Sequence, residues 1–106
     1  YLYLAASLAA GRDGVARGLT PPPPVEADPY AAEGKVALPT SLAAAVEALD
    51  GDSFYRETFG DTLVDYLVMM KRAEVARYAA ALAEAGSADS PDEVTDWEMR
   101  EYFEFF

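Results

Sequence analysis

Apolar residues recur at spacings of three and four along much of the chain, which is the period of an α-helix with one buried face. The first such segment places Leu4, Leu8 and Val15 on one side of a helix. Gly18 follows them, and a glycine at this position commonly ends a helix. We therefore predict a helix over residues 1–18.

A proline-rich stretch comes next. Pro21–Pro24 have fixed backbone angles and no amide donors, so they form an extended segment and cannot continue a helix. We expect a loop over residues 19–39, which is long for a compact domain. The four prolines act either as a rigid spacer, which is the interpretation that we favour, or as a ligand for an aromatic groove.

Residues 40–86 carry the signals of several helices separated by short turns. Apolar segments follow side chains that can cap a helix, and Gly60 and Gly86 mark two of the helix ends. A turn is expected at Asp50–Asp52. The predicted helices run from Thr40 or Ser41 to Leu49, from Ser53 to Phe59, and from Asp61 or Thr62 to Ala85.

The last segment predicts one more helix, over residues 95–106. Thr95 and Glu98 form a capping box, in which the hydroxyl accepts from the amide three residues on and the carboxylate reaches back. No segment shows the alternation of apolar and polar residues that marks a strand. The fold class that we predict is all-α for this chain as a fragment.

The terminal helix is rich in large apolar side chains. Four of them share one side of the helix at spacings of three and four, and two more lie off that side, so much of its circumference is apolar. An ordinary core helix is one interpretation, but exposed apolar patches of this kind commonly mark interfaces. We predict a subunit interface formed by Trp97, Met99, Tyr102, Phe103, Phe105 and Phe106.

The composition is strongly acidic. Nineteen acidic residues against eight basic ones give a formal net charge of -11, which repels phosphate backbones and anionic lipid. No apolar run approaches the roughly 20 residues of a membrane-spanning helix. Nucleic acid and membrane surfaces are therefore poor partners for this chain.

The chain contains no cysteine and no histidine. These absences exclude disulfides, thiol catalysis, Ser-His triads and imidazole metal sites built on this chain. The lack of cysteine also fits a reducing compartment, so we expect a cytoplasmic protein.

Two charged clusters are candidates for chemistry. Asp61 and Asp65 lie four apart on a predicted helix and can in principle act as acid and base or bind a cation, but a solvated acidic face is the better interpretation. Lys71, Arg72 and Arg77 suit a phosphate or a carboxylate, and we expect them to pair with acidic neighbours of the same fold. No catalytic, cofactor-binding or metal-binding residue is assigned to this chain.

The first residues are already in helical pattern, and no Ser, Asp or Asn precedes them to cap a helix. This favours a chain that begins inside a helix of a longer protein. A processed terminus at a natural domain edge is the alternative.

A series of short motifs resembles, in its order, the C-terminal quarter of the glutamine synthetase family. The first helix is similar to the one that follows an Asn-Pro pair in that family, and the closing motif is similar to the branch that includes γ-glutamyl-amine ligases. The motifs that carry the resemblance are Tyr1–Leu2, Ala5–Ala6, Leu8–Gly14, Gly18–Leu19 with the proline run, Asp28–Tyr30, Leu38–Leu49, Lys71–Glu74, Val94–Glu98 and Arg100–Tyr102.

The resemblance implies an ATP-dependent ligase that joins the γ-carboxylate of glutamate to ammonia or an amine, with Mg or Mn as its metal. The nucleotide-binding, metal-binding and catalytic residues of that family come mainly from segments before this region, so the resemblance implies none here. It also implies that the helices pack on the sheet of a larger α+β catalytic domain. The expected partners are the rest of the parent chain and other copies in a homo-oligomer, where the terminal helix grips a facing ring.

Tyr30 falls near the position of a tyrosine that some bacterial members of the family adenylylate. The family motif reads Asn-Leu-Tyr-Asp-Leu-Pro-Pro, whereas the residues here are Asp28–Glu33, reading Asp-Pro-Tyr-Ala-Ala-Glu. Tyr30 is therefore a candidate regulatory residue in surroundings that depart from the family pattern.

The sequence is compatible with two functions from different classes. The first is a fragment of a glutamate-ammonia or glutamate-amine ligase that gives structural support, assists oligomer assembly and is inactive alone. The second is an independent acidic helical module for protein interaction, without a catalytic parent.

Overall fold

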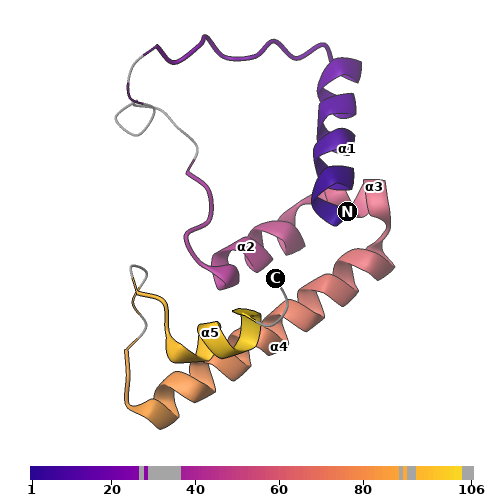
Figure 1. Ribbon diagram of the computed structural model, residues 1–106. Helices are drawn as coiled ribbons and strands as arrows, with labels where there is room; N and C mark the ends of the chain where they lie inside the picture. Colours follow the sequence, from indigo (N-terminus) through magenta and orange to yellow (C-terminus); the bar gives the residue numbers. More distant parts are fainter. Residues whose placement is uncertain (27, 29–36, 89, 91–92, 104–106) are drawn as a thin grey trace. The chain divides into compact units, whose positions relative to one another are not determined.

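The computed structural model describes residues 1–26, 28, 37–88, 90 and 93–103 (Figure 1). The described residues form helices joined by turns and extended segments, and no strand occurs among them, so the all-α prediction is confirmed. The chain divides into two compact units, Tyr1–Ala37 and Leu38–Phe106, and each is described by itself.

The first unit contains α1, Leu2–Ala16, followed by an extended segment that includes the four exposed prolines. The end of α1 is closed by two backbone hydrogen bonds, from the Gly18 amide to the Val15 carbonyl and from the Leu19 amide to the Gly14 carbonyl. This pattern requires a left-handed residue, and Gly18 supplies it with φ of +64°. The helix therefore ends where its glycine signal predicts.

The second unit begins with α2, Leu42–Gly51, and α3, Ser53–Phe59. The Ser41 side chain caps α2 by accepting from the Ala44 amide at 3.1 Å. The turn expected at Asp50–Asp52 is shorter than predicted, because α2 continues through Gly51 and only Asp52 separates the helices. Asp52 is extended, and its carboxylate accepts from the Phe54 amide at 2.7 Å, so it caps α3 directly.

The longest helix is α4, Asp61–Ala85, which begins after Gly60 and ends at Gly86. Both glycines have positive φ, +85° and +63°, which allows the chain to turn sharply at each end of the helix. The small core lies where α2 crosses α4, and α3 packs on the same helix. The core residues Val46, Val64 and Val68 are at most 4% exposed, and Leu49 and Tyr55 pack against them.

The last helix is α5, Asp96–Tyr102, which lies along α4 (Figure 1). Its predicted capping box is present: the Glu98 amide donates to the Thr95 hydroxyl at 3.2 Å, and the Thr95 amide donates to the Glu98 carboxylate at 2.8 Å. Residues 104–106 of the predicted helix lie outside the described part. None of the helices that the structure describes combines the length and hydropathy of a membrane span.

Candidate functional site

Three aromatic rings and one guanidinium hold α5 against α4. The Trp97 ring lies 5.3 Å from the Tyr78 ring of α4 and 6.2 Å from the Tyr102 ring of its own helix, centroid to centroid. The Arg77 guanidinium carbon lies 5.8 Å from the centroid of the Trp97 ring, within the range of a cation–π contact. Trp97 is therefore an anchor of the docked helix within this chain.

Hydrogen bonds to carboxylates complete the attachment of α5. The Tyr102 hydroxyl donates to Glu74 of α4, and Lys71 donates to the other oxygen of the same carboxylate at 2.7 Å. Arg77 donates in turn to Glu101 of α5 at 2.5 Å. Each of the two helices thus supplies one donor and one acceptor to the other. The position of α5 is therefore fixed by polar as well as apolar groups.

The titration behaviour of two of these groups follows from their surroundings. Burial raises the pKa of Glu74, but the hydrogen bonds from Lys71 and Tyr102 outweigh it and leave the pKa below the ordinary 4.5. Burial, and next the hydrogen bond to Glu74, raises the pKa of Tyr102 to about 12. Around neutral pH the pair is thus a phenol donating to a carboxylate.

The predicted interface residues fall on two different sides of α5. Trp97 and Tyr102 face α4 and are half-buried. Met99 and Phe103 are exposed, with exposed fractions of 48% and 73%. Phe105 and Phe106 lie outside the described residues, as does Tyr30. Of the predicted interface residues that the structure describes, Met99 and Phe103 are therefore the exposed ones.

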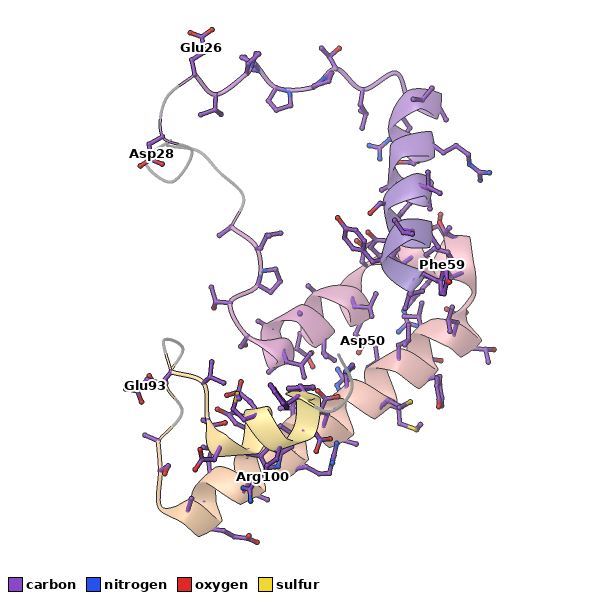
Figure 2. The ribbon with its side chains drawn as sticks, viewed as in Figure 1. Glu26, Asp28, Asp50, Phe59, Glu93 and Arg100 are labelled. Carbon is purple, nitrogen blue, oxygen red and sulfur yellow. The ribbon has the colours of Figure 1, made fainter. Side chains whose placement is uncertain are left out.

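A second charged network joins α2, α3 and α4, and it accounts for the two aspartates singled out in the sequence. Arg56 donates to Asp61 at 3.3 Å and to Asp65 at 2.7 Å. It also pairs with Asp50, which lies at the end of α2 (Figure 2). Asp61 and Asp65, which were expected on a solvated acidic face, thus form ion pairs with Arg56 of the same chain.

The basic cluster of α4 is also used within the chain, as predicted. Arg72 donates to Glu47 at 2.7 Å and to Asp50 at 2.8 Å, which links α4 to α2. The hydrogen bond from Arg72, and after it the one from Arg56, lowers the pKa of the Asp50 carboxyl. Lys71 pairs with Glu74, and Arg77 pairs with Glu101. The basic cluster therefore forms ion pairs with acidic residues of the same chain.

A pocket of about 370 Å³ lies between the start of α2, the second half of α4 and the segment leading into α5. Its walls combine the rings of Tyr78, Trp97 and Tyr102 with the carboxylates of Glu74 and Glu93, and Figure 2 marks Glu93 just before α5. Rings beside carboxylates suit an apolar or cationic group better than a phosphate. The pocket could not be predicted from a local sequence motif, because its walls come from three separate segments of the chain.

A comparison with models of protein families matches residues 1–102 to the family described as glutamine synthetase, catalytic domain. The chain belongs to the glutamine synthetase family. The resemblance carried by the short motifs is thereby confirmed. No solved structure matches the chain convincingly.

Curated relatives of the glutamine synthetase family agree with this assignment. The chain is 39% identical over 104 residues to a gamma-glutamylanilide synthase from an Acinetobacter species, which covers 97% of the chain and 20% of the relative. It is 33% identical over 104 residues to a gamma-glutamylethanolamide synthetase from Streptomyces coelicolor, covering 98% and 20%. A glutamine synthetase from Methanococcus maripaludis is 32% identical over 109 residues, covering 96% and 22%. The chain thus spans about a fifth of the length of these relatives.

The metal implied by the glutamine synthetase family does not fit the residues described here. No group of three or more Asp or Glu side chains in the described ranges is arranged to hold a metal ion. The carboxylates that do gather, such as Asp50, Asp61 and Asp65, receive hydrogen bonds from Arg56. A metal site needs several carboxylates that converge on one metal ion. Here the three carboxylates converge on the guanidinium of Arg56 instead.

Proposed function

We propose that this chain is the C-terminal part of the catalytic domain of an ATP-dependent ligase that joins glutamate to ammonia or an amine. The observation that carries the proposal is the family match, which extends over residues 1–102. Relatives named as glutamine synthetase, gamma-glutamylanilide synthase and gamma-glutamylethanolamide synthetase align with at least 96% of the chain. Binding of ATP and of Mg or Mn is assigned to the rest of the parent protein.

The role of this chain in the parent is support and assembly. Arg56 and Arg72 tie three helices together around Asp50, and Trp97 and Tyr102 hold α5 on α4. A rigid α5 then presents Met99 and Phe103 outward. Apolar side chains held on a fixed helix suit a subunit contact, because little conformational entropy is lost when they are covered. The chain alone is without ligase activity, and the parent acts in the cytoplasm.

The ligase assignment is tested on the full-length protein encoded by the reading frame that contains this chain. Purified protein is incubated with glutamate, ATP and Mg or Mn, and separately with ammonium, aniline or ethanolamine as the acceptor. We expect a γ-glutamyl amide by mass spectrometry together with ADP and phosphate, and no product from residues 1–106 alone. The acceptor that gives the product identifies the amine class.

A full-length protein that makes no amide with any acceptor would contradict the proposal. If, in addition, residues 1–106 alone form a monomer with a cooperative thermal transition, the acidic interaction module gains support. Product formation by residues 1–106 alone would contradict the assignment of the active site to the rest of the parent.

The assembly role is tested with Met99→Ser and Phe103→Ser in the full-length protein. Each variant should shift the mass measured by light scattering toward smaller assemblies while the secondary structure is kept. Arg100→Ser is the matched control, since Arg100 is an exposed but charged residue of the same helix (Figure 2). An unchanged assembly mass in both apolar variants would contradict the proposal that α5 forms the subunit interface.

A further inference from the structure

The pocket between α2, α4 and the segment before α5 brings aromatic rings and carboxylates together. Its volume of about 370 Å³ lies at the small end of ordinary ligand pockets. All of its walls belong to one compact unit of the chain, Leu38–Phe106. Its rings are those of Tyr78, Trp97 and Tyr102, and its carboxylates are those of Glu74, Glu93 and Glu98. A small molecule in the pocket therefore meets aromatic surface and negative charge at once.

The negative charge of the pocket is only partly neutralised by the chain. No lysine or arginine is among the described residues that line it. Lys71, which does not line the pocket, pairs with Glu74 at 2.7 Å. Glu98 accepts from the uncharged amide and hydroxyl of Thr95. Glu93 forms no ion pair within the part of the chain that the structure describes. Two carboxylates are thus left without a cationic partner there.

These walls discriminate among the possible classes of ligand. The carboxylates repel an anion. A wholly apolar molecule would displace water from Glu93 and Glu98 without replacing its hydrogen bonds, which costs free energy. A metal ion needs several oxygen ligands within about 2.6 Å, and no group of three or more acidic side chains in the described ranges is arranged in that way. A cation with an apolar body, in contrast, suits both the rings and the carboxylates.

We propose that this pocket binds an organic ammonium cation, whose apolar part lies against the rings and whose N–H groups donate to the carboxylates. Aromatic faces attract cations, and Trp97 already has the Arg77 guanidinium carbon 5.8 Å from its ring centroid. Glu93 lies just before α5 in an exposed position, so it can pair with an ammonium group without breaking an existing ion pair (Figure 2). The proposal goes beyond the ligase assignment and does not require it.

Phenethylammonium is a suitable probe, because it combines one ring with one primary ammonium group. Phenethyl alcohol and phenylacetate are its neutral and anionic counterparts. The full-length protein, without ATP and glutamate, is titrated with each compound, and hydrogen exchange of the α5 amides is followed by mass spectrometry. We expect phenethylammonium to slow this exchange, the alcohol to bind about tenfold more weakly, and phenylacetate to give no protection.

Substitutions in the walls locate the bound compound. Glu93→Gln should weaken binding about threefold, as expected for loss of an exposed ion pair. Its control is Glu84→Gln, which removes the same charge from an exposed position of α4 that does not line the pocket. Ala43→Phe places a ring in the pocket and should abolish protection, whereas Ala44→Phe alters the next position of α2, outside the walls. Each variant is also measured without ligand, which detects any change in α5 itself.

Several outcomes would overturn the proposal. Phenethylammonium that gives no protection of α5, or no more than the alcohol, contradicts recognition of a cation at the pocket. Equal weakening by Glu93→Gln and Glu84→Gln assigns the effect to the general negative charge of the chain. Binding that is unchanged in both Glu93→Gln and Ala43→Phe places the compound elsewhere on the protein. Amide formation is measured separately with ATP and glutamate, so failure of the ligase assignment is distinguished from failure of this pocket to bind.

Discussion

The hydroxyl of Tyr102 donates a hydrogen bond to the carboxylate of Glu74, although the two residues lie 28 positions apart in the chain. The bond joins the last turn of α5 to the middle of α4. Glu74 is also held by Lys71, and its side chain is only 13% exposed. A helix of only seven residues is thus held in place by a hydrogen bond to another helix.

Tyr102→Phe should loosen α5 without unfolding α4. The change keeps the ring that packs on Trp97 and removes only the hydroxyl, so we expect a loss of about 1–2 kcal/mol in the free energy of opening α5. Hydrogen exchange of the α5 amides, followed by mass spectrometry, measures this loss. Tyr3→Phe is the control, because Tyr3 is 80% exposed on α1. Equal effects from both variants would show that the hydroxyl contact is unimportant.

Attachment of α5 should have both an acid limit and an alkaline limit. The pKa of Glu74 is lowered in the fold, so its contribution is complete above the ordinary 4.5 and is lost as the pH falls through the lowered value. The pKa of Tyr102 is raised to about 12, so its contribution is complete below the ordinary 10.0 and is lost as the pH rises through 12. Trp97 is the chain's one tryptophan, and its fluorescence reports both limits in residues 38–106. Tyr102→Phe should abolish the specific alkaline step.

Thr95→Ala should weaken α5 by removing its cap. The hydroxyl accepts from the Glu98 amide at 3.2 Å and is one of the two side-chain groups that form the capping box. Loss of such a cap costs about 1 kcal/mol. Thr95→Ser keeps the hydroxyl and should restore amide protection in α5 to near the original level. Equal amide protection in the alanine and serine variants would show that the Thr95 hydroxyl does not stabilise α5.

Asp50→Asn should lower the melting temperature of the helical unit and reduce its dependence on salt. Within the part of the chain that the structure describes, Asp50 is the carboxylate that contacts both Arg56 and Arg72. At about 1 M salt the Debye length falls to roughly 3 Å, so the difference between the variant and the original chain should shrink there. Because the pKa of Asp50 is lowered in the fold, the difference should be complete above the ordinary 3.8 and disappear as the pH falls through the lowered value.

The control for Asp50→Asn is Glu57→Gln, which removes one negative charge from an exposed position on α3. In a chain of net charge -11, removing a carboxylate relieves general repulsion, so this variant should be neutral or slightly more stable. Thermal melting by circular dichroism compares the two. A stabilising effect of Asp50→Asn of the same size would mean that general repulsion outweighs the network.

The helix ends were predictable because their signals are local. Ser41, Thr95 and Gly86 each act on groups within a few residues along the chain, and each lies at the helix end that its type predicts. The turn at Asp50–Asp52 was predicted too long, since Asp52 caps α3 while α2 still continues through Gly51. The position of a capping side chain therefore determines where one helix ends and the next begins to within one or two residues.

The sides of α5 could not be assigned from its own pattern. Met99, Tyr102 and Phe103 share a stripe at helical spacing, yet Tyr102 faces α4 while Met99 and Phe103 are exposed. Trp97, which lies off that stripe, is an anchor. The choice depends on Glu74, Arg77 and Tyr78 of α4, whose partners on α5 lie 19 to 28 positions further along the chain.

The sequence by itself determined the helical elements, their caps, the acidic character of the chain and, through the order of its motifs, the family. These properties depend on residues close together along the chain or on the order of short motifs. Only the tertiary structure decided that Asp50 contacts two arginines, that Glu74 accepts a hydrogen bond from Tyr102, and that Tyr66, Met69 and Met70 of α4 stay about half exposed. Contacts between distant segments depend on how helices pack, and a helical pattern specifies which residues share a side but not which neighbour that side meets.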